Sequence, residues 1–273
     1  MRRGLVLVFP GIEGRGALNE AICRGLAAGG VNCAIELYDW TSSLGPLYNL
    51  GAEHRNRRMA GRIADRVVAY NDAYPGRPVV LVGQSGGGAI AIWAAEHLTW
   101  GGDVEGVILI APSLSPQYDL ARAAANSKRG VVNFYSPHDW MLLSTAITGT
   151  MDGELTASAG RVGFEEPEAQ SRPAAYDKVF QIPWEPSMAR CGHSGGHLSS
   201  GASDFIAGYV APLVRTEKWS RPFIADLLRR QSLPAASQPT ASPASGRAAA
   251  WRPGSRPADA DQPTTVPCPQ DSP

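Results

Sequence analysis

The sequence has few cysteines, no excess of charge of either sign and no long apolar run. Its four cysteines are spread over 273 residues with no C-x-x-C pair, so neither a disulfide framework nor a zinc ribbon is expected. Basic and acidic residues both number 25, and the zero net charge argues against nucleic acid as a partner. No apolar stretch reaches the ~20 residues of a membrane-spanning helix, so no membrane span is expected.

The N-terminus resembles a secretory signal only faintly. Met1-Arg2-Arg3 precedes a short apolar stretch that ends at Pro10-Gly11, which is too short for the apolar part of a signal peptide. The same residues make a good first strand. We therefore expect the chain as written to be cytoplasmic, or exported if a segment upstream of it carries a signal.

Apolar runs alternate with helical patterns over most of the chain. The runs are rich in Val, Ile and Leu and nearly continuous, as in strands that are buried on both faces. Strands are predicted at 4–9, 31–38, 78–83, 104–111, 129–135 and 178–183, and helices at 17–29, 51–74, 87–99, 117–126 and 202–215. This alternation predicts an α/β fold with a mostly parallel central sheet and helices on both faces.

Composition divides the chain into two parts. Residues 1–232 are predicted to form one catalytic domain, in which 145–175 are either a flap over the site or a long surface loop. From Leu233 onward Pro, Ala, Ser, Thr and Gln dominate. Such a segment buries too little apolar area to offset its ordering entropy, so 233–273 are predicted to be a disordered tail.

Gly83-Gln84-Ser85-Gly86-Gly87 is the most informative motif. It follows the apolar run 78–82 and precedes a helical pattern, which is the strand-turn-helix context of a nucleophile elbow. The glycines permit a very tight turn, and the turn would raise the Ser85 hydroxyl above the sheet edge at a helix N-terminus. The alternative is a glycine-rich turn without chemistry.

A serine nucleophile needs a base, and the base needs an orienting acid. Asp139 directly follows the predicted strand 129–135, at the edge where Ser85 is expected, and is the leading acid. Two histidines in the loop before the last predicted helix compete for the role of base. His197 is favoured because two glycines precede it and let the loop turn inward, and His193 is the alternative.

An oxyanion hole needs two backbone N–H groups, and the sequence offers candidates for both. One is Gly86, directly after the serine, and the other is Ile12 in the loop after the first strand. Trp40, Trp140 and Phe164 are candidates for an acyl pocket, although each is also consistent with ordinary packing.

Two rival motifs fit less well. Gly14-Arg15-Gly16, with Glu36 and Asp39 about 20 residues on, echoes a dinucleotide fingerprint, but Asn19 stands at its third glycine position. Cys191, His193 and His197 have a metal-like spacing, yet no further ligand is nearby and Gly195-Gly196 disfavours a helical histidine pair. We therefore expect no cofactor and no metal.

Together these features resemble the α/β-hydrolase fold superfamily over residues 4–216. The resemblance implies Ser85 as nucleophile, His197 as general base and Asp139 as its orienting acid. It also implies a serine hydrolase that cleaves carboxylic esters or thioesters through an acyl-enzyme. The short stretch 112–129 indicates no large lid domain. A small-molecule acyl ester is the expected partner, and the oligomeric state stays open. A catalytically silent binding protein of this fold is the alternative, and a dinucleotide-binding protein is a weaker one.

Overall fold

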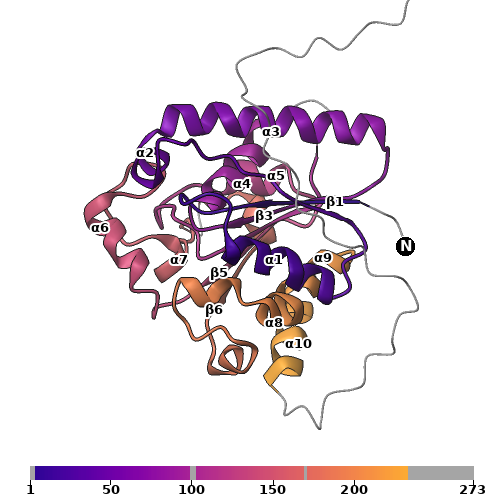
Figure 1. Cartoon of the computed structure of the whole chain (residues 1–273). Helices are drawn as coiled ribbons and strands as arrows, with labels where there is room; N and C mark the ends of the chain where they lie inside the picture. The colour runs from indigo at the N-terminus through magenta and orange to yellow at the C-terminus, as the bar shows by residue number, and fades with distance from the viewer. Residues whose placement is uncertain (1–3, 99–102, 169–170, 233–273) are drawn as a thin grey trace, which may run out of the picture.

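A six-stranded parallel sheet lies at the centre of the computed structural model, which describes residues 4–98, 103–168 and 171–232 (Figure 1). The strands are β1 (Leu5–Phe9), β2 (Ala34–Leu37), β3 (Val79–Gln84), β4 (Gly106–Ile110), β5 (Val131–Tyr135) and β6 (Val179–Pro183). Their order across the sheet is β2-β1-β3-β4-β5-β6. All six predicted strands are confirmed, with ends that differ by a few residues, because buried Val, Ile and Leu runs are a strong local signal.

The helices agree with the sequence where they are long and differ where they are short. The predicted helices appear as α1 (Ala17–Ala28), α3 (Glu53–Ala73), α4 (Gly86–His97) and α5 (Ala121–Ala125). The last predicted helix is divided into α8 (Ser203–Phe205), a π-helical stretch (Ile206–Val210) and α9 (Ala211–Arg215). The structure adds α2 (Pro46–Gly51), α6 (Thr145–Thr148), α7 (Ala159–Val162) and α10 (Arg221–Ser232).

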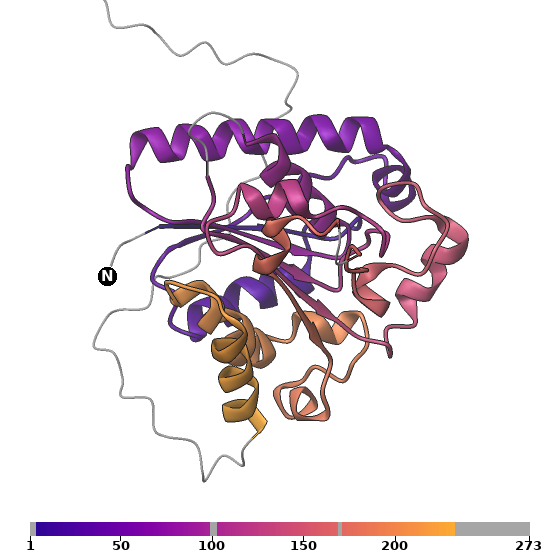
Figure 2. The same cartoon turned by 180° about the vertical axis from the view of Figure 1, so that it is seen from behind.

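Helices cover both faces of the sheet, as predicted (Figures 1 and 2). Alternate side chains of β1 enter two separate cores: Leu7 packs with residues of α3, α4 and α5, and Val8 packs with residues of α1, α8 and α9. This alternation follows from the two-residue period of a strand. Both cores are closed by apolar helix faces, so the α/β fold class is confirmed.

The chain changes direction in the sheet between β1 and β3. It leaves β1 toward α1 on one face and β3 toward α4 on the other face, since β2 and β3 flank β1 on opposite sides. Phe9 is paired with Gly83, so the segments that follow the two strands begin side by side. In open α/β sheets such a switch point is where ligands bind, at the carboxyl ends of the strands.

The segment 145–175 contains only short helical turns, among them α6 and α7, and no large helical lid is found among the described residues. These elements lie beside the carboxyl ends of the strands in Figure 1. Among the described helices none is both long and apolar enough to cross a membrane. The predicted tail, 233–273, falls outside the described part of the chain.

Candidate functional site

Ser85 occupies the predicted turn between β3 and α4, with φ of 53° and ψ of −123°. This backbone conformation is sparsely populated by residues with a side chain and costs of order 1–3 kcal/mol. The neighbouring segments hold it in place. The Ser85 N–H donates to the Ile110 carbonyl at 3.0 Å, and the Ser85 carbonyl accepts from the Ser113 N–H at 3.0 Å. The backbone N–H and carbonyl of Ser85 are therefore both bonded, one to the last residue of β4 and the other to the segment just after it.

The glycines of the motif permit close backbone packing. A Cβ at Gly87 would overlap the carbonyl oxygens of Phe9 and Pro10, so α4 begins directly against the end of β1. A Cβ at Gly86 would lie 3.4 Å from the backbone nitrogen of Ile12. As the first residue of α4, Gly86 has no intrahelical partner for its N–H. The structure thus brings together the two backbones predicted to supply an oxyanion hole.

Two side chains hold the loop after β1, and the sequence did not single out either of them for this role. The indole N–H of Trp40 donates to the Pro10 carbonyl at 2.7 Å, and Trp40 is fully buried. The Asn49 side-chain amide, which comes from α2, donates to the Ile12 carbonyl at 2.9 Å. Because each bond joins residues that are thirty or more positions apart in the sequence, no local pattern predicts it.

Asp139 lies just beyond β5, only 1% exposed, and both of its carboxylate oxygens are engaged. Oδ1 accepts from the Leu142 N–H at 3.1 Å. Oδ2 lies 2.7 Å from Nδ1 of His197. A carboxylate only accepts, so His197 carries its proton on Nδ1 and leaves Nε2 without one in the neutral ring. This is the protonation state that a general base requires.

The structure joins His197, and not His193, to Asp139 by a hydrogen bond. The loop before His197 turns at Gly195, whose φ is +93°, in agreement with the expected use of glycine there. His193 instead places Nδ1 3.1 Å from the Ser199 hydroxyl and packs against the Phe205 ring. Burial lowers the pKa of His193 to about 4. The geometry therefore favours His197 between the two histidines.

Strand order, helix placement and the strained serine at the end of β3 agree with one known architecture. The chain has the α/β-hydrolase fold.

Comparisons with solved structures give matches at low sequence identity. A protein described as a hydrolase of the alpha/beta superfamily, from Xanthomonas campestris pv. campestris, is 18% identical with a TM-score of 0.41, covering 77% of this chain and 99% of that one. Lipase B of Aspergillus fumigatus is 12% identical with a TM-score of 0.48, covering 83% of this chain and 56% of that one. Est1E of Butyrivibrio proteoclasticus is 12% identical with a TM-score of 0.41, covering 84% of this chain and 89% of that one. No family model matches the sequence, and no curated protein matches it.

The Gln84 side chain reaches the candidate base. Its Nε2 lies 3.2 Å from Nε2 of His197, and Gln84 is 1% exposed. Among the described residues, the Ser85 hydroxyl makes no hydrogen bond with His197. In this hydrolase fold the nitrogen of His197 that faces away from Asp139 is thus bonded to the residue before the serine.

The predicted acyl-pocket residues differ in their exposure. Trp40 is fully buried and holds Pro10, and Phe164 is 6% exposed within the core beneath α4. Neither side chain presents a surface to a substrate here, so these two assignments are corrected to structural packing. Trp140 is 71% exposed next to Asp139, with the Arg161 guanidinium 5.1 Å from its ring centroid.

Most large exposed apolar side chains belong to segments around the candidate site. They share sequence neighbourhoods with Asp139, His197 or Asn49: Leu44, Leu47, Tyr48, Trp140, Met141, Leu143, Ile147 and Leu198. The segments after Asp139 and around Asn49 lie at the carboxyl edge of the sheet, as α6 and α2 in Figure 1. Exposed apolar side chains are therefore concentrated on segments next to the candidate site in sequence.

The turn of the dinucleotide-like motif packs against a carboxylate of the protein itself. The Arg15 backbone N–H donates to the Asp39 carboxylate at 3.3 Å, and a Cβ at Gly14 would lie 3.4 Å from the same carboxylate. Asp39 also accepts from Thr41. A carboxylate thus takes the place beside this turn that a dinucleotide phosphate would need, and the dinucleotide alternative is not supported.

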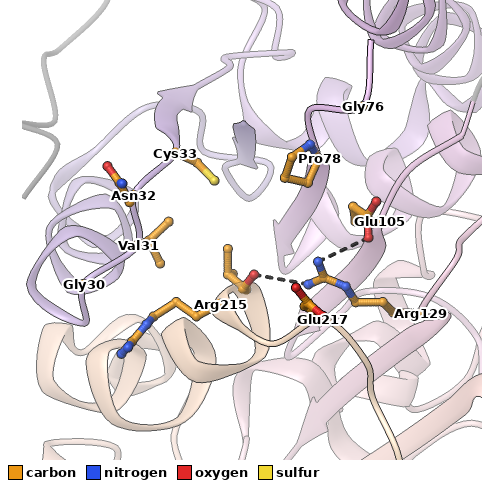
Figure 3. Close-up of a pocket in the computed structure, with 11 residues that line it drawn as sticks. Gly30, Val31, Asn32, Cys33, Gly76, Pro78, Glu105, Arg129, Arg215 and Glu217 are labelled. Carbon is orange, nitrogen blue, oxygen red and sulfur yellow. Dashed lines mark hydrogen bonds and ion pairs between the residues drawn. The ribbon is translucent and has the colours of Figure 1, made fainter. Parts of the chain in front are cut away.

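A cavity of about 810 Å³ opens at the opposite edge of the sheet, away from Ser85 (Figure 3). Pro78, Glu105 and Arg129 line it from just before β3, β4 and β5, so it lies at the amino ends of the strands. The Arg129 guanidinium pairs with Glu105 at 3.2 Å and donates to the Val214 carbonyl at 3.1 Å, as the dashed lines show. None of the candidate catalytic residues borders this cavity.

Proposed function

We propose that this protein is a serine hydrolase that cleaves carboxylic esters or thioesters through an acyl-enzyme. In this proposal Ser85 is the nucleophile, His197 the general base and Asp139 the acid that orients it. Backbone N–H groups of Ile12 and Gly86 bind the oxyanion. The observation that carries the proposal is the buried 2.7 Å bond between Asp139 and His197, at the same sheet edge as the strained serine.

Each proposed group has a defined step. The Ser85 hydroxyl oxygen attacks the ester carbonyl carbon while its proton passes to Nε2 of His197. The carbonyl oxygen becomes an oxyanion, which two backbone N–H donors stabilise. The intermediate then collapses, the C–O bond to the leaving group breaks, and His197 returns the proton to the departing alcohol. Water, deprotonated by His197, attacks the acyl-enzyme, releases the acid and restores Ser85.

Asp139 supports this role of His197 electrostatically. Its carboxylate accepts a hydrogen bond from the Nδ1–H, fixes the tautomer and stabilises the imidazolium that forms when Nε2 takes up a proton. The Leu142 N–H holds its second oxygen and prevents the carboxylate from rotating. A buried acid with both oxygens engaged is a rigid support for the histidine.

The exposed apolar side chains on segments next to the candidate site support substrates with an apolar acyl or alcohol part. Leu47 is 77% exposed, Ile147 84% and Leu198 68%, and apolar surface of this kind is stabilised by contact with apolar ligand groups. We expect esters with aliphatic or aromatic groups to be cleaved better than short, highly polar esters.

A fluorophosphonate probe tests the proposed nucleophile. We expect the wild-type protein to become covalently labelled and the Ser85→Ala variant to stay unlabelled, because the probe phosphonylates an activated serine oxygen. Burst release from a p-nitrophenyl ester would show the acyl-enzyme. If wild type and Ser85→Ala label equally, the proposal fails, and the catalytically silent binding protein becomes the better interpretation.

The two histidines provide a matched pair for the base. We expect His197→Gln to reduce the labelling rate by about 10³-fold or more, since the proton acceptor is lost. His193→Gln should keep most of the rate, because His193 bonds to Ser199 and not to Asp139. A large loss from His193→Gln together with a small one from His197→Gln would reverse the assignment.

A further inference from the structure

The Gln84 amide occupies the one position on His197 that the proposed reaction uses. The Nδ1–H of His197 donates a hydrogen bond to Asp139, so Nε2 of the neutral ring has a lone pair and no proton. Gln84 Nε2 lies 3.2 Å from that nitrogen. The amide nitrogen therefore donates to the imidazole lone pair.

The opposite orientation of the amide is excluded because it would place two hydrogen-bond acceptors against each other. If Gln84 were turned about its last bond, its carbonyl oxygen would face the imidazole lone pair, and two acceptors would repel each other. The Asp139 contact thus determines the amide orientation as well as the histidine tautomer. In this orientation Gln84 Oε1 is buried and has no hydrogen-bond partner among the described residues. It lies 3.0 Å from the position of a Cβ built on Gly11, in the loop after β1.

An imidazole nitrogen has a single lone pair in the ring plane. Gln84 and Ser85 are adjacent in sequence and both need this lone pair, one to hold it and one to deliver a proton to it. When the lone pair accepts a bond from Gln84, it is not free for the Ser85 hydroxyl. This competition accounts for the absence, within the described structure, of a Ser85–His197 hydrogen bond.

We propose that Gln84 is a positioning residue that caps the base in the resting protein and withdraws from it when substrate enters. The inference rests on the proposed function, since it assigns a role within that site. Gln84 thus stabilises neutral His197 before the reaction and leaves Ser85 to engage Nε2 only with substrate present.

The surroundings of His197 define what else acts on its titration. Asp139 faces its Nδ1 side, and neutral His193 lies on the same loop, with a pKa lowered by burial. His138 is next to Asp139, and its Cβ lies 3.0 Å from the position of a Cβ built on Gly195. Glu13, near Gly11, is the charged group on the side of Gln84. None of these changes in a variant at Gln84, so a shift can be assigned to the amide.

The test is a nitrogen-15 NMR titration of His197 in wild type, Gln84→Leu and Gln84→Asn. Donation to the lone pair favours the neutral ring, so removing it should raise the pKa of His197 by about 0.7 unit, the size of one net hydrogen bond. Gln84→Asn shortens the side chain by one methylene and retains polarity, so it tests the same point if Gln84→Leu does not fold. Gln181→Leu, which removes an amide that within the described structure bonds only to the Phe164 backbone, is the matched control.

The labelling rate is the second readout. Above the pKa of His197, Gln84→Leu and Gln84→Asn should react with fluorophosphonate about fivefold faster than wild type, because the competing donor is gone. An unshifted His197 pKa with an equal or slower labelling rate would overturn the inference. If wild type itself fails to label, the proposed function fails, whereas the NMR titration still decides whether Gln84 caps His197.

Discussion

Single side chains anchor the loop that carries Ile12. Trp40 and Trp93 are both fully buried, yet only the Trp40 indole has a hydrogen-bond partner among the described residues. Breaking the bond from Trp40 leaves the buried Pro10 carbonyl without its donor, which costs about 1–3 kcal/mol. The indole of Trp93 can be replaced without breaking such a bond.

This contrast gives a prediction with its own control. We expect Trp40→Phe to lower the free energy of unfolding by about 1–2 kcal/mol more than Trp93→Phe, because both substitutions remove similar apolar area and only one removes a bond. Urea unfolding followed by circular dichroism measures both. Equal losses in the two variants would show that the Trp40–Pro10 bond contributes nothing to stability.

Titration of His193 is a second property at the scale of the residue. Burial lowers its pKa from 6.5 to about 4, so the unfolded chain binds more protons than the folded one between these values. The stability that His193 contributes is complete above pH 6.5 and is lost as the pH falls toward 4. Between pH 7 and pH 5 the loss is about 2 kcal/mol.

We therefore expect the His193→Gln variant to lose less stability on acidification than wild type, by about 2 kcal/mol between pH 7 and pH 5. Urea unfolding at the two pH values gives the difference directly. Parallel losses in the two proteins would mean that His193 does not titrate as its burial implies.

At the scale of the element, the strand-turn-helix unit of β3 and α4 depends on the absence of a side chain at its glycines. A Cβ at Gly87 would meet two backbone oxygens, which have no freedom to move aside. A Cβ at Gly51, the last residue of α2, would meet nothing within 4 Å. The same substitution therefore has opposite consequences at the two positions.

We expect Gly87→Ala to lower the free energy of unfolding by about 3 kcal/mol, because α4 must move away from β1. It should also reduce fluorophosphonate labelling, since the Gly86 N–H moves with α4. Gly51→Ala should change stability by no more than about 0.5 kcal/mol, or raise it, because alanine favours helix. Thermal unfolding of the two variants is sufficient, and a harmless Gly87→Ala would show that α4 is not packed as tightly as described.

At the scale of the whole molecule, α10 packs against the core that contains Val8, although its sequence is mostly polar. Ile224 and Leu227 are buried against residues of the other elements on that face. The Arg190 guanidinium donates to the carbonyls of Gln231 and Ser232 at 2.9 and 2.7 Å. The described part of the folded domain thus includes α10, and the boundary expected at residue 232 stays a prediction.

Truncation tests that boundary. A chain that ends at Ser232 should unfold at the same temperature as the full chain and keep its labelling rate. A chain that ends at Ser220 lacks two buried side chains worth roughly 1.5–3 kcal/mol each and should unfold about 10 °C lower. Differential scanning calorimetry measures both, and destabilisation by the first truncation would place residues of the C-terminal segment in the folded domain.

The predictable parts of this protein are those encoded by neighbouring residues. Buried apolar runs predict all six strands, and the order of strand, glycine-flanked serine and helix predicts the turn at Ser85. Asp139 is a candidate acid from the sequence because it lies just beyond the end of a strand. The short helices α2, α6 and α7 were missed because four to six residues carry too little periodicity.

The sequence by itself determined the α/β class, the serine turn and the short set of acids and histidines that can reach it, because each depends on local pattern and chain order. Only the tertiary structure decided that Asp139 bonds His197 and that His193 bonds Ser199. It alone brought Gln84 onto His197 across 113 residues of sequence, and turned Trp40 from an acyl-pocket candidate into the support of Pro10. The physical reason is that a hydrogen bond depends on distances of about 3 Å and on direction, which only the packing of the two cores on the sheet sets.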